Sequence, residues 1–223
     1  MTTSRQIDAS LSHSILDESE ESNLSPRDTG VLQTVMEEGL TVFTFDGLKR
    51  LTGLHQEKLS RIIDRLEEEG LLEKVDEGYR ITGRGNETIP RPLSTALQPI
   101  PIVQSLLPRD VDLQQIISGL KGRWFGGLRW LGYSQDNDAT ILKWIAEEDG
   151  IQIDARFTDS YLSIDAKVAE GREVSQAVKA AHQLLGHVSG LYGTPTRRRQ
   201  HLASQIAYYP SLDFAYTVTG IMD

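Results

Sequence analysis

The sequence predicts an α+β protein, in which three helices and a β-hairpin precede an antiparallel β-sheet domain covered by a helix. Three observations predict this class. Apolar residues recur at helical spacing within residues 24–69. They alternate at strand spacing within residues 71–82 and 151–168. A proline-rich stretch, residues 85–110, separates the two patterned regions, and 223 residues suffice for two compact units.

The composition of the chain excludes several kinds of site and of protein. The chain has no cysteine, which excludes disulfides, thiolate metal sites and a cysteine nucleophile. A net charge of −9 argues against a protein that coats nucleic acid without specificity. No stretch is apolar for long enough to span a bilayer, and the first residues lack the pattern of a secretory signal. We therefore expect a cytoplasmic protein without membrane contact.

Residues 1–23 are rich in Ser, Asp and Glu and show no apolar periodicity, which predicts a mobile acidic tail. A short helix docked on a partner subunit is the alternative. Order is expected from Leu24, where Ser25 and Pro26 suit the start of a helix and Gly39 suits its end.

Two further helices and a hairpin follow the first helix. Thr44 is a suitable N-cap for a second helix, which ends before Gly53. After a tight turn, a third helix is predicted over residues 56–69, with Gly70 as its terminator. Residues 71–82 then predict two short strands around a polar turn.

One stretch within this unit carries a family resemblance. Residues 48–72 read LKRLTGLHQEKLSRIIDRLEEEGLL, with a helix, a glycine turn, a second helix, a glycine and an apolar strand in order. This register resembles the winged helix-turn-helix regulators of the MarR and TrmB kind over about sixty residues. The resemblance implies that residues 24–84 form a winged helix-turn-helix domain and that the protein is a DNA-binding transcriptional regulator, not an enzyme.

In such a domain the third helix enters the major groove and the hairpin forms the wing. The expected partner is double-stranded DNA, read by a homodimer on a two-fold related operator. Residues on the first two turns of the helix would reach base edges, the next arginine would contact phosphate, and basic residues on or after the hairpin would contact the backbone or minor groove. The predicted DNA-binding residues are Gln56, Glu57, Lys58, Ser60, Arg61, Arg65, Lys74, Arg80 and Arg84.

Three features oppose this interpretation. Residues 24–84 contain nine basic and twelve acidic residues, a local net charge of −3 where a DNA-binding domain is usually basic. Glu57 and Arg61 have the i, i+4 spacing of a helical ion pair. His55 occupies the N-cap position of the third helix, and histidine caps poorly. The alternative is a winged-helix adaptor that binds protein without direct contact to DNA.

The second half of the chain predicts one further domain. Five prolines within residues 85–110 predict a linker that packs against a neighbouring surface. Residues 111–223 are expected to form an α+β dimerisation or effector-binding domain. It contains a short helix over 111–120, a four-stranded antiparallel meander over 123–133, 139–147, 151–158 and 162–168, an amphipathic helix over 174–191, and a last strand near Phe214. The role of the basic run Arg197–Arg199 stays open.

The three tryptophans, Trp124, Trp130 and Trp144, all lie in this second domain. They either line a pocket for a small-molecule effector or belong to the core or a dimer interface. No phosphate loop, dinucleotide fingerprint or nucleophile elbow occurs. His182 and His187 are five residues apart and would not share a helix face. We therefore expect no cofactor, no metal site and no catalytic residue.

Overall fold

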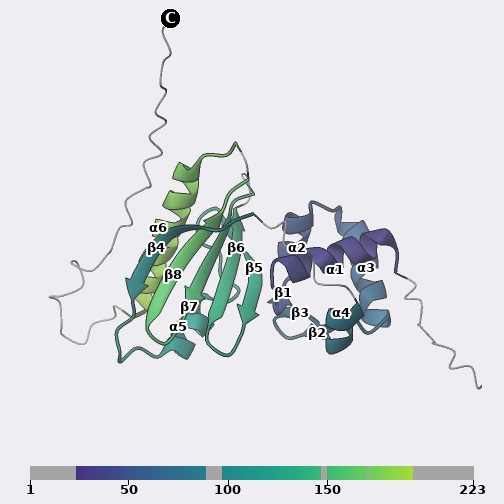
Figure 1. The fold of residues 1–223 in the computed structure, drawn as a ribbon, viewed down its shortest axis with the longest axis horizontal. Coiled ribbons are helices and arrows are strands. Elements are labelled where there is room, and N and C mark those ends of the chain that lie inside the picture. Colours follow the sequence, from purple (N-terminus) through teal and green to yellow (C-terminus); the bar gives the residue numbers. More distant parts are fainter. Residues whose placement is uncertain (1–23, 89–96, 147–149, 170, 193–223) are drawn as a thin grey trace, which may run out of the picture.

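The computed structural model describes residues 24–88, 97–146, 150–169 and 171–192 (Figure 1). Within these residues the protein is mixed α+β, with six helices and one eight-stranded antiparallel sheet. The expectations for residues 1–23, for Arg197–Arg199 and for a last strand near Phe214 lie outside the described residues.

The N-terminal unit contains three longer helices, a short fourth helix and three short strands. These are α1 (Pro26–Glu37), β1 (Val42–Phe43), α2 (Phe45–Thr52), α3 (Gln56–Glu68), β2 (Leu72–Val75), β3 (Gly78–Ile81) and α4 (Gly83–Thr88). The first three helices and the hairpin lie within about two residues of their predicted bounds, whereas α4 was not predicted.

Local capping explains where these helices begin and end. The Ser25 side chain accepts a hydrogen bond from the backbone of Asp28, and the Asp28 carboxylate accepts one from the Ser25 backbone, forming a capping box. Thr44 caps α2 by accepting from Gly47. Gly53 ends α2 in the left-handed conformation, with a φ of 65° that favours glycine.

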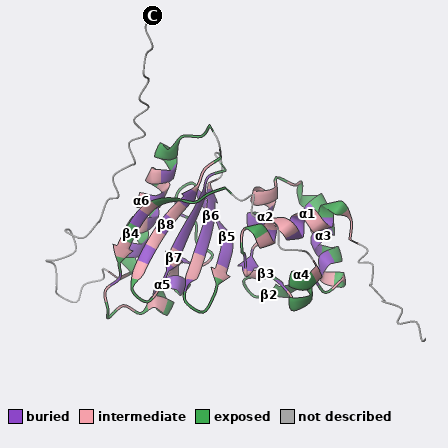
Figure 2. Ribbon diagram, in the orientation of Figure 1, coloured by how far each residue is buried: buried purple, intermediate pink, exposed green. Residues whose placement is uncertain are grey.

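The C-terminal unit contains five strands and two helices. These are β4 (Ile100–Leu106), α5 (Leu113–Leu120), β5 (Leu128–Gln135), β6 (Thr140–Ala146), β7 (Gln152–Phe157), β8 (Tyr161–Lys167) and α6 (Val174–Tyr192). Strands β5 to β8 form an antiparallel meander, as expected. Helix α6 contacts β4, β7 and β8, and its residues Ala177, Ala181, Leu184 and Val188 are buried in one apolar core with these strands (Figure 2).

Residues 85–110 are more than the predicted linker. Strand β4 lies within them and pairs antiparallel with β8 at the edge of the sheet. The prolines are incompatible with a central strand, but an edge strand tolerates them, because one side of an edge strand has no partner to which an N–H must donate. Pro101 occupies this edge, and the register shifts between Pro101 and Val103.

The first strand of the meander begins later than predicted. We expected a strand from Arg123, but β5 starts at Leu128. Phe125 and Leu128 are joined by hydrogen bonds in both directions, and Gly126 between them has a φ of 57°. Because this turn requires a left-handed residue, the glycine delays the strand.

The two units share one continuous sheet of order β2-β3-β1-β5-β6-β7-β8-β4. Strand β1 pairs with β3 on one side and with β5 on the other. A register shift in β5 between Trp130 and Gly132 leaves Leu131 in the apolar core of the N-terminal unit, where it is fully buried. A methyl group on Gly132 would lie 2.2 Å from the Val42 carbonyl oxygen, so the close approach of β1 requires glycine there.

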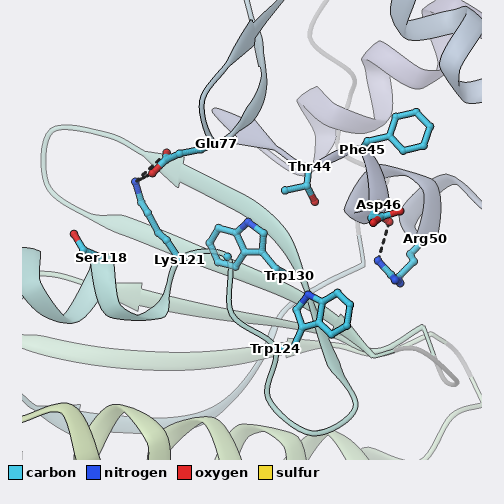
Figure 3. Close-up of a pocket in the computed structure, with 10 residues that line it drawn as sticks. Thr44, Phe45, Asp46, Arg50, Glu77, Ser118, Lys121, Trp124 and Trp130 are labelled. Atoms are coloured by element: carbon cyan, nitrogen blue, oxygen red, sulfur yellow. Dashed lines mark hydrogen bonds and ion pairs between the residues drawn. The ribbon is translucent and has the colours of Figure 1, made fainter.

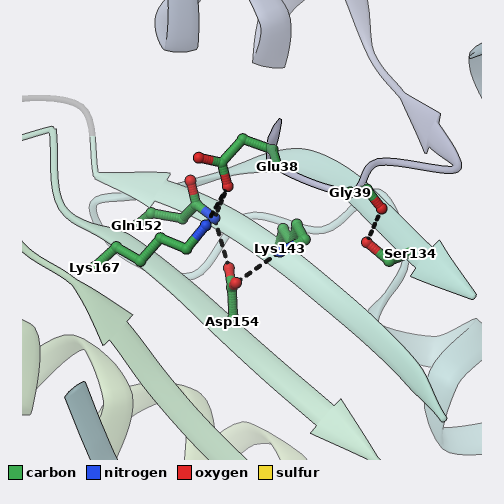
Figure 4. A network of polar contacts seen from close by, with 7 residues as sticks. All are labelled: Glu38, Gly39, Ser134, Lys143, Gln152, Asp154 and Lys167. Carbon is green, nitrogen blue, oxygen red and sulfur yellow. Dashed lines mark hydrogen bonds and ion pairs between the residues drawn. The ribbon is translucent and has the colours of Figure 1, made fainter. Parts of the chain in front are cut away.

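A buried polar network also joins the two units (Figure 4). Glu38, just after α1, accepts hydrogen bonds from Lys167 at 2.5 Å and from Gln152 at 2.7 Å. Gln152 also donates to Asp154, which accepts a further bond from the buried Lys143 at 2.6 Å. The charges of both lysines are therefore compensated, as burial requires. The predicted separation into two units joined by a linker thus understates how tightly they are connected.

Candidate nucleic-acid interface

Helix α3 presents two contrasting faces. Leu59, Ile62, Ile63 and Leu66 are buried against the rest of the N-terminal unit. The predicted base-contacting residues lie on the other side, where Gln56, Glu57, Lys58 and Arg61 are exposed and Ser60 is half-buried. This amphipathic pattern buries the apolar side chains and leaves the polar ones in water.

The position of α3 in the fold keeps this polar face accessible. Helix α3 contacts α1 and β2, and Figure 1 shows it on the side of the N-terminal unit away from strands β5 to β8. The unit is joined to the larger sheet through β1, α2 and the tip of the hairpin. The C-terminal unit therefore does not cover the polar face.

Lys58 and Arg61 are available for an external partner. Neither side chain forms an ion pair or hydrogen bond with any residue in the described part of the chain. The i, i+4 pair of Glu57 with Arg61, which the sequence suggested, is not formed among those residues. The two cations thus lie in solvent on adjacent turns of α3.

The N-terminus of α3 adds a second feature that suits an anion. His55, the N-cap, makes no side-chain capping bond to α3, all of which the structure describes. A hollow of about 410 Å³ lies there, lined partly by Lys49, Arg50 and Gln56. Backbone N–H groups at a helix start and flanking cations together attract phosphate. Lys49 and Arg50 were not among the predicted DNA-binding residues, although they lie in the last turn of α2, just before the turn into α3.

Arg65 has a different role from the predicted phosphate contact. Its guanidinium donates to both carboxylate oxygens of Asp28 on α1, at 3.2 and 2.5 Å. Burial opposes ionisation of Asp28, but the hydrogen bonds from Arg65 and Ser25 outweigh it and hold the pKa of Asp28 below its usual value. Arg65 therefore connects α3 to the start of α1, and its charge is paired with the buried Asp28 carboxylate instead of being available to a DNA phosphate.

The charge along α3 is unequal between its two ends. The half nearer the hairpin carries Asp64, Glu67 and Glu68. Burial first, and then the nearby Glu67 and Asp64, raise the pKa of the Tyr79 hydroxyl on β3. An anionic ligand therefore meets a more favourable field at the N-terminal half of α3, beside Lys58 and Arg61.

The predicted wing residues do not form one surface. Lys74 pairs in register with Tyr79, whereas Arg80 pairs with Glu73, so Lys74 and Arg80 face opposite sides of the hairpin. Arg80 also forms an exposed ion pair with Glu73 at 3.2 Å. Arg84 lies in α4, beyond the hairpin. These positions argue against a wing whose three predicted cations act together.

The hairpin tip is held by the C-terminal unit. Lys121, at the end of α5, donates to both carboxylate oxygens of Glu77 at 3.3 Å, and its ammonium lies 3.7 Å from the centre of the Tyr133 ring. Burial, followed by the neighbouring Glu77 carboxylate, raises the pKa of Tyr133 to about 12. The tip is thus oriented toward α5.

The three tryptophans do not line one pocket. Trp144 is fully buried, and its indole N–H donates to the Arg123 carbonyl at 2.9 Å, which assigns it to the core. Trp130 is 6% exposed and Trp124 is 58% exposed. These two line one cavity together, whereas Trp144 does not contribute to it. The predicted effector pocket is therefore wrong for Trp144.

Neither a metal-binding cluster nor a membrane-spanning helix occurs among the described residues. No group of three or more His, Cys, Asp or Glu side chains among them is arranged to hold a metal ion. His187 instead packs against Phe125, with ring centres 4.7 Å apart. None of the described helices combines the length and apolarity needed to cross a membrane.

Comparisons of this chain with known protein families, with curated proteins and with solved structures each found no match.

Proposed function

We propose that residues 24–84 form a winged helix-turn-helix domain that binds double-stranded DNA, and that the protein is a transcriptional regulator. The observation that carries this proposal is the polar face of α3, where Lys58 and Arg61 are exposed and form no ion pair with described residues. Cations with no counter-charge, on a helix that can enter a major groove, are suited to bases and phosphates.

The contacts expected from this geometry begin at the N-terminus of α3. Gln56 and Arg61 are suited to the edges of adenine and guanine, respectively, and Lys58 to either guanine or a phosphate. The uncapped start of α3, with Lys49 and Arg50 beside it, is suited to a backbone phosphate. The hairpin contributes less, because its tip is held against α5.

The C-terminal unit completes the proposed regulator. In this proposal helix α6 covers one face of the sheet, and the unit supplies the contacts of a homodimer. Two copies related by a two-fold axis would place their α3 helices in successive major grooves of a palindromic operator.

Fluorescence anisotropy on labelled random duplexes, at low and moderate salt, tests DNA binding. We expect the wild-type protein to bind with an affinity that falls as salt rises. The double variant Lys58→Ala/Arg61→Ala should lose at least about tenfold in affinity, since each base contact contributes about 1–3 kcal/mol. A matched control, Arg109→Ala/Lys179→Ala, removes the same charge from exposed positions of the C-terminal unit and should bind within about twofold of wild type.

One observation favours a protein-binding adaptor instead, namely the local net charge of −3 over residues 24–84. The same measurement separates the two functions. An adaptor shows no duplex binding even at low salt, or shows weak binding that the two double variants reduce equally. Either result would contradict the proposal that α3 reads DNA.

A further inference from the structure

A cavity lies at the junction of the two units (Figure 3). Its volume is about 600 Å³, within the usual range of about 300–1,000 Å³ for small-molecule sites. The N-terminal unit contributes the start of α2 and the hairpin tip, and the C-terminal unit contributes the end of α5 and part of β5. The lining residues are Thr44, Phe45, Asp46, Arg50, Glu77, Ser118, Lys121, Gly122, Trp124 and Trp130.

The aromatic part of this lining suits a flat apolar ligand. Trp124 is 58% exposed although it is the largest type of apolar side chain, and the Arg129 guanidinium is stacked 4.6 Å from the centre of its ring. Trp124 and Trp130 both line the cavity (Figure 3). A planar ring placed against Trp124 would remove exposed indole surface from water and gain an aromatic contact.

The polar part of the lining offers hydrogen-bond donors. Trp130 is 94% buried, since 6% of its surface is exposed, and its indole N–H has no partner among the described residues. No fully buried side-chain nitrogen or oxygen in that part of the chain lacks a partner, so this N–H keeps some contact with solvent, and Trp130 is one of the residues that line the cavity. A buried donor facing a cavity is suited to an acceptor on a ligand.

Arg50 supplies a cationic donor at the same cavity. One of its N–H groups donates to the Asp46 carbonyl oxygen at 3.0 Å, and the remaining ones have no hydrogen-bond partner within the described ranges. The two acids of the lining are less available, because Glu77 is bound to Lys121 and Asp46 lies 3.7 Å from the Lys49 ammonium. The unpaired groups are therefore mainly donors, which favours a ligand with accepting oxygens.

We propose that this junction cavity binds a flat aromatic small molecule bearing an oxygen-rich acceptor group, and that the bound molecule changes the affinity of the protein for DNA. The ring would lie against Trp124, while Trp130 and Arg50 donate to the acceptor group. The second part of this inference, that the ligand changes the affinity for DNA, is called the regulatory half below and rests on the proposed function.

The place of the cavity gives the reason for the regulatory half. Arg50 belongs to α2, the helix that precedes the turn into α3, and the adjacent Lys49 lines the hollow at the start of α3. A ligand held by Arg50 therefore engages a cation that lies beside the proposed phosphate site. If DNA and ligand share this cation, each must change the affinity for the other by the same factor.

Binding can be tested on the free protein with 2-naphthoate as the probe, followed by tryptophan fluorescence and by calorimetry. We expect one molecule to bind per chain with a Kd below about 1 mM. Cyclohexylacetate, which has the carboxylate without an aromatic face, should bind at least about tenfold more weakly. The variants Arg50→Gln and Trp124→Ala should each weaken the binding of 2-naphthoate at least about tenfold. The matched control Arg109→Gln, at an exposed position outside the cavity lining, should leave this binding unchanged.

If 2-naphthoate does not bind at about 10 mM, the proposal that the cavity binds a ligand is overturned. The same follows if it binds but neither Arg50→Gln nor Trp124→Ala weakens the binding. Thermal unfolding of each variant identifies any loss of folding, and Arg50→Lys, which keeps the charge, provides a second test at that position. The regulatory half is measured separately by DNA anisotropy with saturating 2-naphthoate. A change in affinity of at least about threefold supports it, and no change overturns it while leaving the pocket in place. Absence of DNA binding overturns the proposed function and the regulatory half, and the fluorescence titration still decides the pocket.

Discussion

Replacing Arg65 with glutamine removes the ion pair between α3 and the first turn of α1. The Asp28 carboxylate is 1% exposed and would lose two charge-assisted hydrogen bonds, while it keeps the one from the Ser25 backbone at 3.0 Å. Leaving a buried charge without its partner costs several kcal/mol. Because the carboxylate keeps its hydrogen bond from the Ser25 backbone, we expect a loss of about 2–3 kcal/mol in the free energy of unfolding, or about 5–10 °C in Tm.

Circular dichroism during thermal and urea unfolding measures this loss, and Arg61→Gln is the matched control on the same helix. Arg61 is exposed and has no ion-pair partner among the described residues, so its replacement should change stability by less than about 0.5 kcal/mol. DNA affinity, measured where both variants are folded, should show the reverse order. Arg61→Gln should weaken binding, and Arg65→Gln should leave it nearly unchanged.

The effect of Arg65→Gln on stability should also depend on pH. The pKa of Asp28 in the folded protein lies below its usual value of 3.8, so the unfolded chain takes up this proton first as the pH falls. The stability from the pair is therefore present above about pH 4 and is lost as the pH falls through the folded pKa. This reasoning would be refuted if Arg65→Gln were as stable as the wild type at neutral pH. It would also be refuted if Arg65→Gln lost as much DNA affinity as Arg61→Gln.

Three further variants test the connection of the units and the start of α3. Gly132→Ala should destabilise the protein by at least about 2 kcal/mol in thermal unfolding, because the new methyl group would clash with a backbone oxygen of β1. The control Gly186→Ala adds a methyl group in open space on α6 and should stabilise the protein by about 0.5–1 kcal/mol. Glu38→Gln should lower the free energy of unfolding in urea by about 1–3 kcal/mol, because it leaves the mostly buried Lys167 of β8 without its counter-charge. An equal loss in Glu37→Gln, a variant of the exposed neighbouring residue, would contradict this explanation. His55→Ser should raise stability by about 0.5–1 kcal/mol by adding the missing N-cap bond, and a lower Tm would exclude that explanation.

Several elements could be predicted because their causes are local. The bounds of α1, α2 and α3 follow from apolar spacing and from capping residues such as Ser25 and Gly53, all within a few positions of the helix ends. The exposure of Gln56, Lys58 and Arg61 follows from the same spacing, because apolar residues on one face leave the other face to water.

Other features depended on contacts between distant parts of the chain. Asp28 and Arg65 are 37 positions apart, and no local pattern indicates that they meet. An interpretation of Arg65 from its place on α3 alone therefore assigned it to DNA. Strand β4 was overlooked for a related reason, because proline is tolerated only once the strand is known to lie at an edge.

By itself, the sequence determined the type and approximate bounds of α1, α2 and α3 and the side of α3 that meets solvent, since both depend on periodicity and caps within one element. Only the tertiary structure decided that the two units share a sheet, that Trp144 is a core residue, and that Trp124 and Trp130 both line a junction cavity. These outcomes depend on which strand edges and side chains come together across long stretches of chain. These pairings are stabilised by the packing of side chains from distant parts of the chain, and the spacing of residues along the sequence does not indicate that packing.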